Sequence, residues 1–170
     1  ILFNHESERR GDEYVTRKIT TKLAEIINGS DVAIQLGNLD SVRDWGYAPD
    51  FVKAMYLMIN HKPNDFVIST NRITSVRDFF KMCALSAGFK PEFTGEGIDE
   101  KCYDRASNKL ICEVNANYYR PAEVVFLQGD YSKIKKELGW TPDTNVETIA
   151  EKMVKFDLDA LVGKNNNYGV

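Results

Sequence analysis

A group of cationic side chains near the start of the chain has the composition of a phosphate-binding segment. Between residues 4 and 18 the sequence places four cations around a glycine: Arg9, Arg10, Gly11, Arg17 and Lys18. An arginine guanidinium can bind two phosphate oxygens at once, and a glycine lets a ligand come close to the backbone. The alternative is a charged loop that contacts only solvent, which is the commoner situation for such residues. This segment is therefore a candidate anion site.

Two further arginines have neighbours that could share a ligand with them. Arg43 follows the dipeptide Gly37-Asn38 within a few residues. Arg120 has a carboxylate three residues later, at Glu123. At that spacing an arginine can hold a phosphate while the carboxylate accepts hydrogen bonds from ribose hydroxyls. The alternative is an ion pair between Arg120 and Glu123, which is the usual result when opposite charges are neighbours.

The acid/base pair of short-chain dehydrogenases, Tyr-x-x-x-Lys, occurs twice, at Tyr14 with Lys18 and at Tyr131 with Lys135. Two fixed residues match easily by chance, and neither pair lies in a long helix beside a nucleotide-binding strand. No Gly-x-x-Gly-x-x-Gly turn follows a strand to hold a pyrophosphate. We therefore expect no catalytic residue in this chain.

Composition limits the class of protein. The chain has 170 residues, 43% of them hydrophobic and 28% charged, as in a globular domain or slightly more than one. The net charge of −3 argues against a nucleic-acid partner, and no apolar run reaches the roughly 20 residues of a membrane span. Three cysteines without a C-x-x-C pair and two histidines argue against a metal site and predict reduced thiols in a cytoplasmic protein.

Apolar residues at helical spacing predict five helices, over 15–27, about 49–59, 76–87, 132–138 and 146–161. The second helix should bury an apolar face formed by Val52, Met55, Tyr56 and Ile59. Ser75 should cap the third helix, and the capping-box pair Thr144 and Glu147 should cap the last one.

Short apolar runs predict strands at 1–3, 32–36 and 66–68, with residues 89–117 irregular apart from short strands near 92–93 and 110–114. Strands that alternate with helices indicate an α/β protein. The run at 66–68 is apolar throughout, as in a strand covered on both faces. Three such strands do not make a well-covered sheet. We therefore expect most of the sheet that residues 1–3 join to lie outside this sequence.

Several longer stretches of the sequence match one family. They are ILFNHESERRGDEYVTRKI (1–19), LGNLDSVRDWGYAPDFVKAM (36–55), DFVIST (65–70), YYRPAEVVFLQGD (118–130), LGWTP (138–142) and the final YGV. Together they closely resemble the C-terminal half of the GDP-mannose 4,6-dehydratases, which are extended short-chain dehydrogenase/reductases. The likeness runs from the first residue to the last.

The resemblance implies a fold. The chain would form the C-terminal half of an extended Rossmann-type protein, with late sheet strands near 1–4 and 65–70 and the smaller α/β substrate-binding domain. The NADP-binding N-terminal region, with its Gly-rich turn and catalytic residues, would lie upstream. We therefore expect the chain as written to be inactive by itself and poorly soluble, because its strands would leave open edges.

The resemblance also implies an activity. The family converts GDP-mannose to GDP-4-keto-6-deoxymannose through bound NADP, by oxidation at C4, loss of water across C5 and C6, and return of the hydride at C6. The product feeds GDP-fucose and related deoxysugars. Members are commonly tetramers or dimers, so the complete protein is expected to be a homo-oligomer.

The resemblance assigns roles to ten residues. His5 and Arg10 fall at positions that contact NADP. Positions that bind the nucleotide sugar fall on Asn4, Val15, Lys18, Gly37, Asn38, Arg43, Arg120 and Glu123. Among these, the two arginines match residues that bind the diphosphate, and Glu123 matches an acid that binds the ribose.

Two residues depart from the family pattern. Glu8 stands where NHESPRRG has proline, and Tyr47 stands where the family has histidine. Glu8 adds negative charge beside Arg9 and Arg10, which bears on cofactor binding and on any subunit contact at this loop. Two alternative functions remain open: an epimerase or reductase of the same superfamily, and a non-catalytic nucleotide-sugar-binding module.

Overall fold

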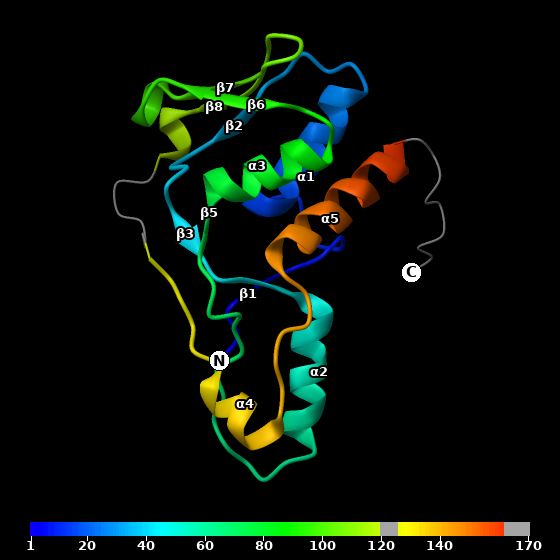
Figure 1. The fold of residues 1–170 in the computed structure, drawn as a ribbon, viewed down its shortest axis with the longest axis vertical. Coiled ribbons are helices and arrows are strands. Elements are labelled where there is room, and N and C mark those ends of the chain that lie inside the picture. Colours follow the sequence, from blue (N-terminus) through cyan, green and yellow to red (C-terminus); the bar gives the residue numbers. More distant parts are fainter. Residues whose placement is uncertain (120–125, 162–170) are drawn as a thin grey trace.

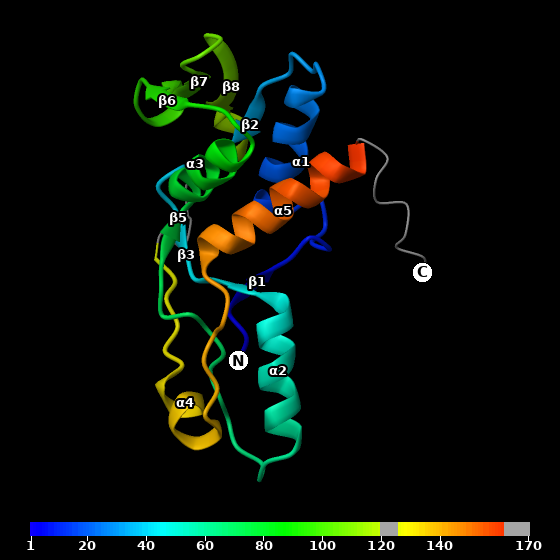
Figure 2. The same cartoon turned by 45° about the vertical axis from the view of Figure 1, so that its right-hand side comes forward.

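The helices and strands form two packed groups that lie one above the other in Figure 1. The structure, a computed structural model, describes residues 1–119 and 126–161. The upper group holds three helices and a four-stranded sheet, and the lower group holds α2 (Ala48–Ile59) and α4 (Ser132–Leu138). The turned view in Figure 2 keeps the same division. The predicted α/β class is confirmed.

Three helices build the larger core in the upper group. They are α1 (Val15–Ile27), α3 (Val76–Ser86) and α5 (Val146–Leu161), and they pack on one another and against the sheet. Their apolar side chains recur at helical spacing, so each helix presents one continuous buried face. The most deeply buried of these side chains include Ile19, Leu23, Phe79, Phe80, Ile149 and Met153.

The four-stranded sheet of the upper group has the order β2-β8-β7-β6. Its strands are β2 (Ile34–Leu36), β8 (Lys109–Val114), β7 (Lys101–Asp104) and β6 (Pro91–Thr94). β2 and β8 are parallel, whereas β8, β7 and β6 are antiparallel. The short strands expected near 92–93 and 110–114 are confirmed. The expectation that the rest of 89–117 is irregular is wrong, because β7 lies between them. The 3-10 turn η1 (Gly97–Asp99) precedes β7, and the 3-10 turn η2 (Ala116–Tyr118) follows β8.

The strand expected at 1–3 begins later than its apolar residues suggest. β1 covers Asn4–Glu6 and pairs in parallel with β4 (Trp45–Tyr47). Residues 66–68 do not form a regular strand, since Leu2 and Ile68 make an isolated parallel bridge. A second two-stranded ladder joins β3 (Val42–Arg43) to β5 (Thr74–Ser75).

The expected apolar face of α2 is wrong. Phe51 and Ala54 are fully buried, whereas Val52, Tyr56 and Ile59 are 59%, 69% and 81% exposed. The helix carries apolar residues on two of its faces. The face that is buried is the one that packs into a smaller hydrophobic cluster shared by α2 and α4. That cluster comprises Phe51, Ala54, Phe66, Ile68, Ile134 and Trp140.

One of the two predicted caps is confirmed. The Ser75 hydroxyl accepts a hydrogen bond from the backbone N–H of Asp78 at 3.0 Å, as an N-cap residue does. The cap of α5 is one residue later than expected. Asn145 Oδ1 accepts from the backbone N–H of Thr148 at 2.8 Å, while the Thr144 N–H donates to Asp50. The capping-box pattern therefore predicts the start of α5 correctly, but the capping residue is Asn145 and not Thr144.

Candidate functional site

Four of the residues assigned to the nucleotide sugar line one pocket. It has a volume of about 430 Å³ and lies where the start of α1 meets the segment that follows β2. Its walls include the predicted residues Val15, Gly37, Asn38 and Arg43. They also include residues that sequence reasoning did not select, among them Glu13, Tyr14, Ser41, Trp45, Val76 and Tyr118.

Local hydrogen bonds explain the shape of this pocket. The chain leaves β2 at Gly37, and Asn38 Oδ1 accepts from the Asp40 N–H at 2.9 Å, which closes a tight turn. The Asn115 N–H donates to the Leu36 carbonyl at 2.8 Å, so the chain after β8 runs beside this turn. This arrangement places Tyr118 directly against Gly37.

Gly37→Ala is expected to deform the pocket. A Cβ atom at position 37 would overlap the backbone carbonyl of Tyr118, and a backbone atom cannot swing aside as a side chain can. We expect a loss of about 1–3 kcal/mol in unfolding free energy, as for other overpacked sites, together with weaker GDP binding. Chemical unfolding and calorimetric titration of the complete protein measure the two effects.

Gly11→Ala is the matched control for this change. A Cβ at position 11 would meet only the carboxylate end of the Glu13 side chain, which can rotate away. Gly11→Ala should therefore leave stability within about 0.5 kcal/mol of wild type. Equal effects of the two changes would show that the contact between Gly37 and Tyr118 is not tight.

Cationic groups lie at and beside the pocket. Arg43 lines it, and its Nη1 donates to the Val42 carbonyl at 2.8 Å. Lys18 does not line the pocket but contacts a residue that does, since its Nζ lies 4.1 Å from the centre of the Tyr118 ring. Burial lowers the pKa of Lys18, and the electron-rich ring face favours its cationic form. The pocket is thus suited to an anion that also has an apolar or aromatic part.

The residues assigned to the cofactor do not line this pocket. His5 lies in β1, where its Nδ1 is 2.9 Å from the Phe3 carbonyl and its ring stacks on Phe51 at 5.2 Å. Arg10 lies flat on the Tyr14 ring, with its guanidinium carbon 3.4 Å from the ring centre. Asn4 is in the same strand as His5, and its partner across the ladder is Trp45. Asn4 and Arg10 therefore lie behind the pocket wall, next to the lining residues Trp45 and Tyr14 respectively.

Glu6 is a buried residue that sequence reasoning did not select. Its side chain is 2% exposed, accepts a hydrogen bond from Thr16 Oγ1 at 2.5 Å, and has Oε2 3.2 Å from Arg10 Nε. Burial raises the pKa of Glu6, while Thr16 and Arg10 favour the charged form. The sequence contains one signal for the pair of Glu6 and Arg10, which is the spacing of four residues between an acid and a base. That spacing usually indicates an ion pair on a solvent-exposed surface.

The two departures from the family pattern contact each other. The Tyr47 hydroxyl lies 3.2 Å from both Glu8 carboxylate oxygens and donates to them. The Glu8 carbonyl accepts from Arg17 Nη1 at 2.6 Å, and Arg17 Nη2 pairs with the buried Asp157 at 2.8 Å. Residue 8 is therefore held on two sides, by β4 and by α1, so its added charge has a partner within the chain.

The contact between Glu8 and Tyr47 is expected to contribute about 1 kcal/mol, as a partly exposed hydrogen bond to a charged group does. A double-mutant cycle with Glu8→Ala and Tyr47→Phe, followed by urea unfolding of the complete protein, measures this coupling. Tyr56→Phe is the control, because Tyr56 is 69% exposed. Additive effects of the two single changes would contradict the contact.

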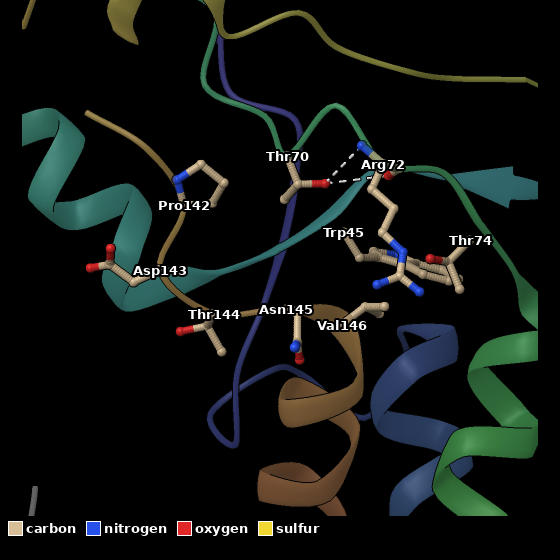
Figure 3. A pocket seen from close by; sticks show the side chains of 9 residues that line it. All are labelled: Trp45, Thr70, Arg72, Thr74, Pro142, Asp143, Thr144, Asn145 and Val146. Carbon is tan, nitrogen blue, oxygen red and sulfur yellow. Dashed lines mark hydrogen bonds between the residues drawn. The ribbon is translucent and has the colours of Figure 1, made fainter. Parts of the chain in front are cut away.

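A smaller cavity of about 180 Å³ lies beside Trp45 at the start of α5 (Figure 3). Its most conspicuous cation, Arg72, already forms a two-pronged ion pair with Glu147, at 2.9 and 2.5 Å. That hydrogen bonding lowers the pKa of Glu147. We therefore regard the Arg72 pair as a link between its loop and α5, and the larger pocket as the candidate site.

Some expectations concern residues or groups that the structure does not place at the site. Arg120 and Glu123 lie outside the described residues, so their roles stay predictions. Within residues 1–119 and 126–161, no group of three or more His, Cys, Asp or Glu side chains could hold a metal ion. In the same part of the chain, no helix is long and apolar enough to cross a membrane.

Comparison with known proteins agrees with the resemblance seen in the sequence. The family model described as GDP-mannose 4,6 dehydratase matches residues 1–153. A GDP-mannose 4,6-dehydratase of Yersinia enterocolitica is 46% identical over 169 residues, covering 93% of this chain and 45% of that protein. The human GDP-mannose 4,6 dehydratase is 43% identical over 162 residues, with 95% and 44% covered. The chain thus spans about half the length of the curated relatives it matches.

Solved structures support the fold. The protein RMD of Pseudomonas aeruginosa, solved with NADPH, superposes with a TM-score of 0.74 at 15% identity, covering 94% of this chain and 47% of that one. A UDP-glucose 4-epimerase of Thermotoga maritima, solved with UDP-glucose, gives 0.72 at 22% identity, with 94% and 45% covered. These likenesses confirm the predicted partial Rossmann-type fold. The match to the family model over nine-tenths of the chain goes further, and the chain belongs to the GDP-mannose 4,6-dehydratase family.

Proposed function

We propose that the complete protein containing this chain is a GDP-mannose 4,6-dehydratase, and that this chain supplies most of its nucleotide-sugar pocket. The observation that carries the proposal is the 430 Å³ pocket itself, which brings Val15, Gly37, Asn38 and Arg43 together in a chain of this family. These residues come from α1, from the turn after β2 and from β3, so only folding makes them neighbours.

The chemistry of the pocket suits a nucleoside diphosphate sugar. Arg43 would bind the diphosphate, and Lys18 adds positive charge behind Tyr118. The aromatic faces of Tyr14, Trp45 and Tyr118 offer surface for a base or a sugar ring, and Asn38 adds polar groups. An enclosure of mixed apolar and polar character, a few hundred Å³ in size, is typical of small-ligand sites.

The residues present fit part of an NADP site. Arg10 Nε is buried and makes no hydrogen bond to any of the residues that the structure describes, although the Glu6 carboxylate lies 3.2 Å away outside hydrogen-bonding geometry. The ion pair therefore orients Arg10 on Tyr14, and within the described residues the Nε–H has no acceptor. Arg10 and His5 would contact one side of the cofactor, and bound NADP would supply the reversible hydride transfer that the reaction needs. This chain's own contribution is to place positive charge beside the strand end at Asn4.

The remaining features of the proposal concern the complete protein. We propose that it acts as a homo-oligomer in the cytoplasm and that its product feeds GDP-fucose or a related deoxysugar. The chain has no Gly-rich turn, and we do not expect either of its Tyr-x-x-x-Lys pairs, at Tyr14 and at Tyr131, to be the catalytic one. The chain alone should therefore not turn over GDP-mannose.

Incubation of the complete protein with NADP and GDP-mannose tests the proposal. Mass spectrometry should detect a product that has lost one water molecule, and the chain 1–170 in the same assay should yield none. An isomeric product of unchanged mass would instead indicate an epimerase. Binding of GDP-mannose without any product would indicate a non-catalytic binding protein.

A further inference from the structure

Asp44 is a fully buried carboxylate between two residues of the nucleotide pocket. Its side chain is 0% exposed. Arg43 and Trp45, its neighbours along the chain, both line the pocket, whereas Asp44 is not part of the lining. A buried carboxylate is costly unless it accepts hydrogen bonds, so its partners indicate what it does.

Three donors from two distant segments converge on Asp44. The backbone N–H and the hydroxyl of Thr70 donate to Oδ1, at 2.8 and 2.7 Å. The backbone N–H of Gly129 donates to Oδ2 at 3.2 Å. A Cβ at position 129 would overlap the Ser69 side chain, so the backbone can come this close only because residue 129 is glycine.

The bonds to Thr70 extend into the loop that follows it. The Thr70 hydroxyl accepts from the Arg72 N–H at 3.2 Å, and Figure 3 shows this contact above Trp45. Arg72 in turn binds Glu147 at the start of α5. A chain of contacts therefore runs from the buried Asp44 through Thr70 and Arg72 to α5, the longest of the described helices.

Asp44 also stands where the backbone passes from one ladder to another. Arg43 is the last residue of β3, which pairs antiparallel with β5, and Trp45 is the first residue of β4, which pairs in parallel with β1. The residue between them belongs to neither ladder. The relative placement of Arg43 and Trp45 thus depends on how this junction is held, and the side chain of Asp44 holds it.

We propose that Asp44 is a positioning residue of the nucleotide pocket, which acts by binding Thr70 and Gly129 and so fixing the junction that presents Arg43 and Trp45 to the ligand. This inference rests on the proposed function. It assigns Asp44 no contact with the ligand. Its loss should therefore lower nucleotide affinity through a misplaced pocket wall, in addition to any loss of stability.

Asp44→Asn in the complete protein tests this inference. An amide keeps one acceptor oxygen but turns an N–H group toward one of the present donors, so at least one charge-assisted bond is lost. Calorimetric titration with GDP, well below the Tm of each variant, should show affinity about tenfold weaker than wild type. NADP affinity should fall by less than GDP affinity does, because Asp44 bonds to Thr70 and Gly129 and not to the proposed cofactor residues His5 and Arg10.

Asp104→Asn is the matched control. Asp104 is also buried and accepts from the Lys90 and Ser107 backbone N–H groups and from the Ser107 hydroxyl, at 2.8, 3.0 and 2.7 Å. It lies at the end of β7, and it does not line the pocket. Asp104→Asn should lower the Tm but leave GDP affinity at the wild-type value. Asp44→Asn with a lower Tm and unchanged GDP affinity would overturn the inference.

A milder pair of variants covers the case in which Asp44→Asn does not fold. Thr70→Val removes the hydroxyl bond to Asp44 and the hydroxyl's contacts with the Arg72 backbone, but keeps the backbone bond to Asp44, and about threefold weaker GDP binding is expected. Thr70→Ser keeps the hydroxyl and should retain wild-type affinity. Wild-type affinity in Thr70→Val would overturn the inference. Failure of the wild-type protein to bind GDP would contradict the proposed function and this inference with it. Normal binding in wild type and in all the Asp44 and Thr70 variants would overturn the inference alone.

Discussion

Arg43→Ala is expected to weaken GDP binding by the complete protein by about 2–5 kcal/mol, because it leaves a diphosphate without its cationic partner in a partly enclosed pocket. Among the described residues, Arg43 is the arginine that lines the pocket. Arg43→Lys should recover only part of the loss, since an ammonium group cannot bind two phosphate oxygens in the forked geometry of a guanidinium. Calorimetric titration with GDP measures each variant.

Arg105→Ala separates a local contact from a general loss of charge. Arg105 is exposed and lines a different pocket, with Lys81 and Lys90. Its removal changes the net charge by the same amount as Arg43→Ala. GDP affinity should be unchanged in Arg105→Ala. If both variants bind GDP equally weakly, the effect of Arg43 is long-range and the pocket is not the binding site.

The helices were the most predictable part of the fold, because an apolar stripe at helical spacing is visible in the sequence. α1, α3, α4 and α5 lie where they were expected. α2 was placed correctly but with the wrong face inward, since apolar residues occupy two of its faces and Phe51 is the one that meets Trp140 and Ile68. The choice between two apolar faces is made by tertiary partners, which a local pattern does not contain.

The strands β3, β4 and β5 could not be predicted, for a related reason. β3 and β5 have two residues each and β4 has three, too few for an alternating pattern. They exist because distant residues pair, as Asn4 does with Trp45. Asp44 owes its role to this pairing, since it matters only where the chain changes ladders.

The site was predicted through family resemblance more than through chemistry. Val15 and Gly37 carry no functional group that would single them out, yet they lie in the pocket with Asn38 and Arg43. Residue chemistry did identify the cations. It missed Glu6, because a glutamate near arginines is normally a solvent-exposed partner, whereas this one is 2% exposed.

Arg10→Ala is expected to lower the unfolding free energy by about 3 kcal/mol near neutral pH, because it leaves the buried Glu6 carboxylate without its cation. The value is at the low end for a buried pair, since the Arg10 side chain keeps 21% of its surface exposed. The contact of Arg10 with the Tyr14 ring is lost as well. NADP affinity should fall by about 1.5–3 kcal/mol, and by more than GDP affinity does, if Arg10 contacts the cofactor.

The loss of stability in Arg10→Ala should depend on pH in a specific direction. Burial raises the pKa of Glu6 above its ordinary 4.5, and removal of Arg10 takes away one of the groups that hold this pKa down. In the variant the folded protein therefore binds a proton more readily than the unfolded chain does. Its stability relative to wild type is therefore highest below about pH 4.5 and falls as the pH rises through the folded-state pKa of Glu6.

Urea unfolding at about pH 5 and about pH 7.5 measures this difference, and a second change identifies its source. Glu6→Gln keeps an oxygen that can accept from Thr16 but carries no charge, so it should restore much of the stability of Arg10→Ala at the higher pH and little at the lower one. A deficit that is the same at both pH values, and that Glu6→Gln does not relieve, would mean that Arg10 stabilises the fold through its packing on Tyr14. The charge of Glu6 would then be balanced by groups other than Arg10, and the loop from Ser7 to Arg10 would depend on Arg17 and Tyr47 for its position.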